Sequence, residues 1–88
     1  MSIIGNSTKG DKMPELNEKF GYNVRTLRRA LELTQQELAD RSDLNRTYLV
    51  RVESGDRNVT LNTANRIASA LGTDVVTLLS EADAQYGS

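Results

Sequence analysis

The sequence predicts an all-α fold of five short helices, and three observations support this prediction. Apolar residues recur at spacings of three and four, as they do along one side of a helix. Residues that cap helices precede these runs, and glycines follow two of them. No stretch alternates between apolar and polar residues in the way that marks a strand.

The 88 residues suit a single domain with one modest core, which we expect over residues 15–80. Residues 1–14, rich in Ser, Gly, Thr, Asn and Lys, are expected to be a flexible arm, and residues 81–88 a polar tail. The first helix of the domain is predicted over residues 16–32. Its apolar residues at helical spacing are Phe20, Val24, Leu27 and Leu31.

The second helix is predicted over residues 35–41 and begins with a capping box. Thr34 and Glu37 are three residues apart, so each side chain can satisfy a free backbone N–H of the other residue. A four-residue connector follows. Asn45 can then cap the third helix, and Gly55 can close it in the left-handed conformation.

The last two helices follow a polar loop. Thr60 is expected to cap the fourth helix and Gly72 to end it. Its apolar stripe consists of Leu61, Ala64, Ile67, Ala68 and Leu71. Either Thr73 or Asp74 then caps a short fifth helix that ends near Leu79.

Composition excludes several classes of function. Cysteine and histidine are both absent, so there can be no disulfide, no cysteine zinc site and no histidine general base. The sequence has no nucleophile–base pair and no glycine-rich phosphate loop, so we expect neither an enzyme nor a cofactor nor a small-molecule ligand. Because no apolar run is long enough for a signal peptide or a bilayer span, we expect a cytoplasmic protein without a membrane partner.

Charge is unevenly distributed although the net charge is only −1. Residues 22–58 contain seven arginines against six acidic residues, and every cation after Lys19 is an arginine. Arginine presents a planar fork that suits phosphates and guanine edges, whereas lysine is a point charge. This bias favours a nucleic-acid partner, and a purely compositional origin is the alternative.

The third helix, in the stretch LNRTYLVRVESG, has an unusual outward face. With about 100° between successive residues, Leu49 and Val52 point toward the core. The opposite side presents Arg46, Thr47, Val50, Arg51 and Ser54. Arginine can bind guanine O6 and N7, and a small apolar group can meet a thymine methyl, so this face suits a DNA major groove. A solvated face with one stray valine is the alternative.

Spacing within residues 35–54 indicates a helix-turn-helix unit. Counted from the first of these residues, Ala39 is fifth, and Leu49 and Val52 are fifteenth and eighteenth. A small residue at the fifth position allows two helices to cross closely, and the two apolar residues pack the second helix against the first.

The stretches LTQQELA, NRTYLVRVESGDRN and RIASALG resemble the lambda-repressor-like, XRE-type DNA-binding domain over about residues 24–79. The stretch RTYL…ESGDRNVT is especially similar to controller proteins of restriction–modification systems. The resemblance implies a compact five-helix lambda-repressor-like domain. Its third helix would enter the major groove, and its second helix would lie across the DNA backbone.

The resemblance also implies which residues contact bases. Arg46, Thr47 and Arg51 match the base-contacting positions of the family. Tyr48, at the edge of the face, is expected either to contact a base or phosphate or to pack as a half-buried aromatic residue. Val50 is added because of its place on the outward face, where it is expected to touch a thymine methyl.

Five further residues are expected to contact phosphates: Gln35, Asn45, Arg57, Asn58 and Thr60. Gln35 matches the family's phosphate-contacting residue at the start of the second helix, where free N–H groups also favour an anion. For Arg57, a free surface arginine is the alternative.

Arg28 and Glu53 match a pair that, in this family, joins the first helix to the third by an ion pair, and we expect this structural role here. Three residues depart from the family pattern. Asp43 and Glu32 stand where glycine is frequent, and Ala64 replaces a larger residue. None of these changes removes a DNA-contacting group.

One module of this kind reaches only a few base pairs, so tight specific binding requires two modules on neighbouring half-sites. The apolar residues expected to form the interface of a homodimer are Val75, Val76, Leu78 and Leu79. The alternative is that they complete the monomer's own core. We therefore predict a transcriptional regulator that binds a palindromic operator in double-stranded DNA as a homodimer. An antitoxin or adaptor-type module whose main partner is another protein is the alternative function.

Overall fold

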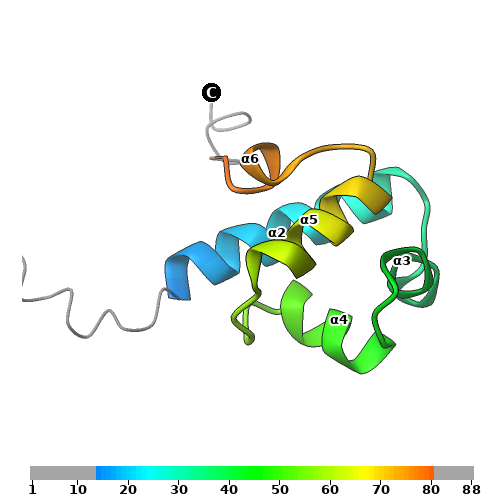
Figure 1. Cartoon of the computed structure of the whole chain (residues 1–88), viewed down its shortest axis with the longest axis horizontal. Coiled ribbons are helices and arrows are strands. Elements are labelled where there is room, and N and C mark those ends of the chain that lie inside the picture. The colour runs from blue at the N-terminus through cyan, green and yellow to red at the C-terminus, as the bar shows by residue number, and fades with distance from the viewer. Residues whose placement is uncertain (1–13, 81–88) are drawn as a thin grey trace, which may run out of the picture.

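The computed structural model describes residues 14–80, which form five helices (Figure 1). Their bounds are α2 Pro14–Ala30, α3 Gln35–Ser42, α4 Arg46–Glu53, α5 Leu61–Ala70 and α6 Val75–Leu78. No strand occurs in this part of the chain, and the predicted all-α fold is confirmed. The expected tail and all of the expected arm except Pro14, which begins α2, fall on residues 1–13 and 81–88, outside the described residues. None of the described helices has the length and apolar character needed to cross a membrane.

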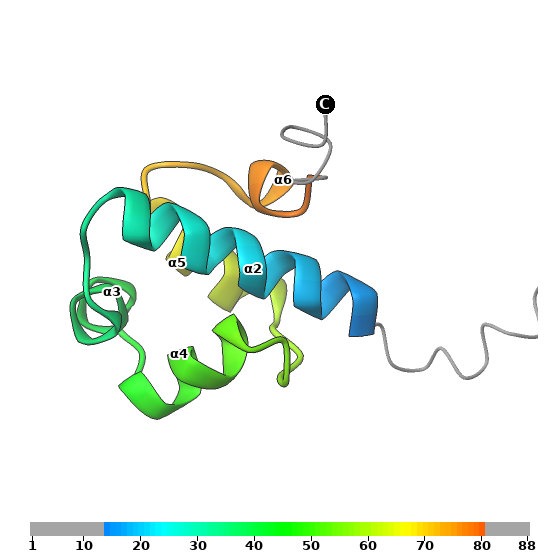
Figure 2. The same cartoon turned by 180° about the vertical axis from the view of Figure 1, so that it is seen from behind.

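The longest helix, α2, runs through the middle of the domain. It contacts α4 on one side and α6 on the other, and both views place these two short helices at opposite edges (Figures 1 and 2). The helix α5 lies along the middle as well, in contact with α3 and α6. In Figure 1, α3 lies at the right end of the domain and α4 below α2, and the side of each helix that faces away from the core is exposed.

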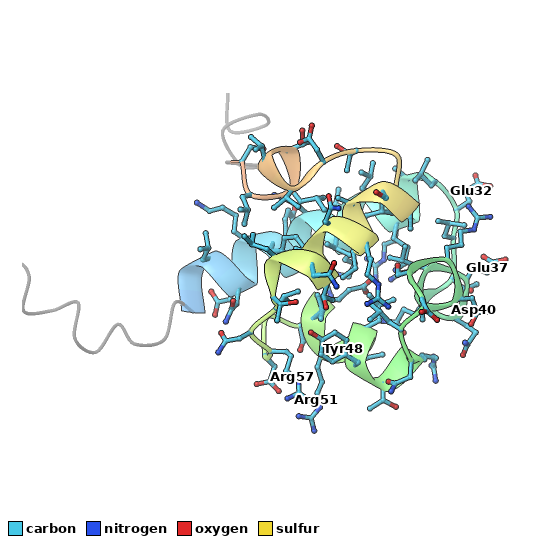
Figure 3. All side chains as sticks on the ribbon, in the orientation of Figure 1. Glu32, Glu37, Asp40, Tyr48, Arg51 and Arg57 are labelled. Carbon is cyan, nitrogen blue, oxygen red and sulfur yellow. The ribbon has the colours of Figure 1, made fainter. Side chains whose placement is uncertain are left out.

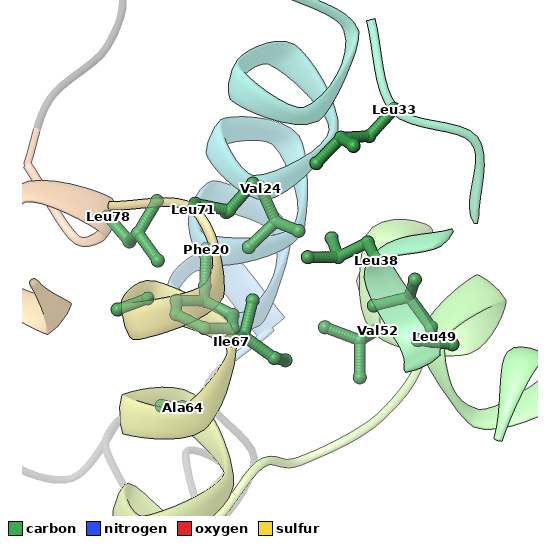
Figure 4. Close-up of a cluster of buried hydrophobic side chains, with 12 residues drawn as sticks. Phe20, Val24, Leu33, Leu38, Leu49, Val52, Ala64, Ile67, Leu71 and Leu78 are labelled. Carbon is green, nitrogen blue, oxygen red and sulfur yellow. The ribbon is translucent and has the colours of Figure 1, made fainter. Parts of the chain in front are cut away.

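All five helices and the α2–α3 turn contribute to one apolar core (Figure 4). Its largest side chains with less than 2% exposure are Leu38, Leu49, Ile67, Leu78, Val24 and Val52. Burial of each such aliphatic side chain contributes roughly 1.5–3 kcal/mol before the loss of conformational entropy is counted. The core therefore holds α4 by Leu49 and Val52, the two residues expected to point inward.

The first helix ends earlier than predicted, and one of its expected apolar contacts is wrong. α2 stops at Ala30, and Glu32 has a positive φ of 59°, which turns the chain away from the helix direction. Leu31 is consequently 47% exposed. Leu33, two residues on, is 9% exposed and joins the core in its place. The helical periodicity is thus interrupted at the turn.

The predicted caps of α3, α4 and α5 are confirmed. The Thr34 hydroxyl accepts the N–H of Glu37 at 3.0 Å, and the Glu37 carboxylate accepts the N–H of Thr34 at 2.8 Å. Asn45 and Thr60 each accept the N–H of the residue three positions later, at 2.8 and 3.1 Å. These bonds satisfy N–H groups that have no acceptor inside the helix.

At α6 the structure decides between the two expected caps. Asp74 is the cap, because its carboxylate accepts the N–H of Thr77 at 2.9 Å. Backbone and side-chain hydrogen bonding from Thr77 lowers the pKa of the Asp74 carboxyl below its ordinary value. Gly55 and Gly72 have φ values of 79° and 76°, as expected of glycines that follow a helix.

Gly21 allows α2 and α4 to approach closely. A Cβ atom at this position would collide with the carbonyl oxygen of Val52 and would lie 2.9 Å from that of Glu53. Both atoms belong to the backbone of the last turn of α4, so neither can rotate away. This contact therefore sets the distance between α2 and α4, and with it the position of α4 on the domain.

We predict that Gly21→Ala destabilises the domain by about 1–3 kcal/mol, because the added methyl forces α2 and α4 apart. Urea denaturation followed by circular dichroism measures this loss. Thr26→Ala, on the exposed side of the same helix, is the control and should change stability by less than about 0.5 kcal/mol. Equal midpoints for Gly21→Ala and wild type would show that the two helices do not touch here.

Candidate nucleic-acid interface

The helices α3 and α4 are joined by a short turn whose backbone is held from both sides. Asp43 adopts the left-handed conformation, with φ 60° and ψ 45°, at the position where glycine is frequent in the family. The Leu44 N–H donates to the Ala39 carbonyl at 2.8 Å. From α5, the Arg66 guanidinium donates to the carbonyls of Ser42 and Asp43 at 3.2 and 2.8 Å. These hydrogen bonds fix the conformation of the turn, and with it the orientation of α4 relative to α3.

The outward face of α4 is the surface that the sequence predicted. Leu49 and Val52 are buried, whereas the opposite side is open to solvent. Its exposed residues are Arg46, Thr47, Val50, Arg51 and Ser54. Figure 3 shows the Arg51 side chain extended away from the body of the domain. Two guanidinium groups, two hydroxyls and an aliphatic side chain are thus presented together.

Tyr48 and Arg57 form a pair at the edge of this face. The Tyr48 side chain is half-buried and packs against the core. The Arg57 guanidinium carbon lies 5.4 Å from the centre of the Tyr48 ring, within the range of a cation–π interaction. Arg57 is therefore not a free surface arginine: the ring positions it beside Arg51 (Figure 3).

Three acidic side chains lie away from this face. Figure 3 places Glu37 and Asp40 at the outer edge of α3, and Glu32 above them in the turn between α2 and α3. On that edge Asp40 accepts a hydrogen bond from the Gln36 amide at 2.9 Å. Tyr48, Arg51 and Arg57 lie together on a different side of the molecule. The arginines on the outward face of α4 are thus apart from these three acids, whereas the exposed Asp56 directly precedes Arg57 in the chain.

The expected phosphate-contacting residues are at the surface, but several already have partners. Gln35 is half-buried and donates one amide hydrogen to Glu53 at 3.1 Å. The Thr60 hydroxyl caps α5 and also donates to Thr63. Asn58 accepts a hydrogen bond from Asn17 of α2 at 2.7 Å, which ties the loop after α4 to α2. Exposed Asn45 and Asn58 keep amide hydrogens for another acceptor.

Arg28 and Glu53 form the ion pair that the resemblance implied. Arg28 Nε donates to one carboxylate oxygen at 2.6 Å and Arg28 Nη2 to the other at 3.0 Å. A third donor, Nη1, bonds the carbonyl of Leu33 at 2.8 Å. The two residues are only 8% and 4% exposed, and none of the buried side-chain polar atoms within residues 14–80 lacks a partner.

The residues expected at a dimer interface divide into three groups. Leu78 is 1% exposed and belongs to the core of the monomer, so its assignment to an interface is wrong. It is buried because α6 packs on both α2 and α5. Val75 and Leu79 are half-buried against the core. Val76 alone of the four is largely free, with 78% of its surface exposed.

Sequence reasoning did not single out two residues that shape this site. Arg66 holds the α3–α4 turn from a distant helix, and no local pattern distinguishes it from a surface arginine. Gly21 lies within a helix, where glycine has no obvious purpose until its neighbour is known. A glycine inside a predicted helix is, however, a usable signal of close helix packing.

The fold and this surface define a helix-turn-helix protein of the lambda-repressor-like type. The family model described as HTH_3, helix-turn-helix, matches residues 24–78, and the chain belongs to this XRE-like family of DNA-binding transcription regulators.

Known proteins with similar sequences or structures include restriction–modification controllers. The control protein C.SmaI of Serratia marcescens is 45% identical over 65 residues, which cover 74% of this chain and 77% of that protein. The restriction–modification controller protein C.AhdI from Aeromonas hydrophila, known from a crystal structure, is 42% identical in sequence and matches with a TM-score of 0.68. The match covers 70% of this chain and 94% of the C.AhdI chain. A hypothetical transcription factor from Neisseria, NHTF, is 32% identical with a TM-score of 0.76, over 82% and 83% of the two chains.

We predict that Arg28→Ala destabilises the domain by about 3–5 kcal/mol, because it leaves the Glu53 carboxylate buried without its cation. Arg28→Lys should lose less, since it keeps the charge but not the fork that bonds both oxygens. Chemical denaturation at neutral pH measures both losses, with the exposed Arg41→Ala as control. If Arg28→Ala were as stable as wild type, the ion pair would have no structural role.

Proposed function

We propose that the protein is a sequence-specific regulator of transcription that binds a palindromic DNA operator as a homodimer. The observation that carries this proposal is the exposed face of α4, on which Arg46, Thr47 and Arg51 surround Val50. A helix of this width fits the major groove, where base edges differ in donors, acceptors and methyl groups. Membership of a DNA-binding helix-turn-helix family supports the same docking mode.

In this mode Arg46 and Arg51 donate to guanine edges, Thr47 bonds a base or the adjacent phosphate, and Val50 contacts a thymine methyl. Arg51 is well placed for the first role because it extends freely from α4 (Figure 3). Tyr48 then acts mainly as a support, since its ring packs on the core and positions Arg57.

Phosphate contacts on either side of α4 would set the register of the domain on DNA. The backbone N–H of Gln35 opens α3, and the Arg57 guanidinium and the free amide hydrogens of Asn45 and Asn58 lie at the surface. Thr60 is the weakest of the five expected phosphate contacts, because its hydroxyl is already used within the first turn of α5.

A homodimer follows from the small size of the α4 face. Specific affinities of about 10⁻⁸ to 10⁻¹¹ M generally require two such modules on half-sites about one helical turn apart. We place Val76 at the centre of the interface, with the half-buried Val75 and Leu79 beside it. Dimerisation would also make operator occupancy depend steeply on protein concentration.

The similarity to C.SmaI and C.AhdI suggests a role as the controller of a restriction–modification system. An antitoxin or adaptor-type module whose main partner is another protein is the second candidate. The exposed face of α4, which has two arginines and no acidic side chain, favours DNA as the primary ligand.

Selection of bound sequences from random duplex DNA tests specific recognition. We expect a two-fold symmetric motif for wild type, and we expect Arg51→Ala to relax it at particular base pairs, each by about 1–3 kcal/mol of discrimination. Val50→Asp should weaken preference at a thymine. Salt-sensitive binding without a motif, identical in all three proteins, would leave only backbone attraction and favour a protein partner.

Sedimentation of Val76→Asp tests the homodimer. An isolated carboxylate at the centre of an apolar interface should shift the protein to monomers and weaken operator binding, without loss of helicity, because Val76 is 78% exposed in the monomer. Leu61→Asp is a matched control, since Leu61 is equally exposed but begins α5. Dissociation by Leu61→Asp alone would place the interface elsewhere.

A further inference from the structure

An open pocket of about 440 Å³ lies where the second half of α2 meets the first turns of α3 and α4. Its lining consists of Arg25, Arg28, Arg29, Thr34, Gln35, Gln36 and Arg46. Four of these seven residues are arginines, and none is acidic. The pocket thus joins three segments that are separate in sequence into one basic surface.

Three of the four arginines have no counter-ion among residues 14–80. Arg28 is neutralised by Glu53 and forms part of the structure. For Arg25, Arg29 and Arg46, no carboxylate within residues 14–80 lies at ion-pair distance. Arg25 and Arg29 are four residues apart on α2 and therefore share one side of that helix. Three like charges around a common space repel one another, and an anion between them relieves this repulsion.

The donors around the pocket suit an oxyanion. Guanidinium groups donate paired N–H bonds in a geometry that matches phosphate oxygens. The backbone N–H groups of Gln35 and Gln36 begin α3, and neither has an acceptor within residues 14–80. Gln35 and Gln36 are therefore additional donors to an anion that the arginines hold.

We propose that this arginine pocket binds one phosphate of the DNA backbone, and that Arg25 and Arg29 are DNA-binding residues. The inference rests on the proposed function and extends it from α3 and α4 onto α2. A DNA phosphate is favoured over a free ion because Arg46 belongs both to the pocket and to the outward face of α4. An anion in the pocket consequently lies at the edge of the groove that α4 enters.

Salt titrations of DNA binding test the role of the pocket charges. Arg25→Gln and Arg29→Gln should each weaken binding on the order of tenfold, on operator and on unrelated duplex alike. The slope of log K against log salt should become less steep by about 1, with the selected motif unchanged. Arg41→Gln removes the same charge from an exposed site outside the pocket and should leave the slope as in wild type.

Uncharged methylphosphonates, placed one at a time along the backbone, identify the phosphate itself. Wild type should lose affinity when the methylphosphonate stands at one symmetric position in each half-site. In Arg29→Gln, whose affinity is already reduced, the same methylphosphonate should cause little further loss. Full additivity of the two losses would overturn the proposal. So would equal effects of Arg41→Gln and Arg29→Gln, which would show only a dependence on net charge.

Two outcomes distinguish the proposed phosphate contact from a free-anion site and from failure of the proposed function. If inorganic phosphate at constant ionic strength displaces DNA regardless of where the methylphosphonate lies, the pocket is a free-anion site and the assignment to the backbone is overturned. If wild type selects no motif, the proposed sequence-specific function fails. The salt slopes measured on unrelated duplex still test whether the pocket binds a DNA phosphate. Identical slopes for wild type and Arg29→Gln would overturn the proposal about the pocket without affecting the proposed function.

Discussion

The buried ion pair between Arg28 and Glu53 connects the parts of the domain that must stay together for α4 to face a ligand. One guanidinium bonds the carboxylate at the end of α4 and the carbonyl of Leu33 in the turn before α3. Gln35, the first residue of α3, bonds the same carboxylate. The side chains of Arg28 and Glu53 therefore connect α2, the start of α3 with the turn before it, and α4. Breaking such a pair leaves a buried charge without compensation, so the arrangement is strongly constrained.

The surface proposed to bind DNA depends on this arrangement. Leu49 and Val52 fix one side of α4 in the core, Gly21 lets α2 lie against its last turn, and Arg66 holds the turn that precedes it. These contacts fix which side of α4 is exposed. The same packing brings the start of α4 next to α2 and α3, and so turns separate arginines into one pocket with a shared positive charge.

Most of the secondary structure was predictable because its signals are local. The capping residues of α3, α4 and α5 act on N–H groups three residues away, and each was found where expected. The outward face of α4 followed from helical periodicity alone. The errors arose where a turn or a tertiary contact intervened. Leu31 follows the end of α2 and is exposed, and Leu78 is buried because α6 packs on two other helices.

The sequence by itself determined that the domain is helical, the caps of α3, α4 and α5 and the residues on each face of α4, since these depend on neighbours within about one helical turn. Only the tertiary structure decided that Arg46 lies close to Arg25 and Arg29. The four-residue spacing of Arg25 and Arg29 places them on one side of α2, but nothing in the sequence predicts that Arg46 of α4 shares a pocket with them. Whether an apolar residue such as Val76 stays exposed was likewise decided by packing, because burial depends on which other helix covers it.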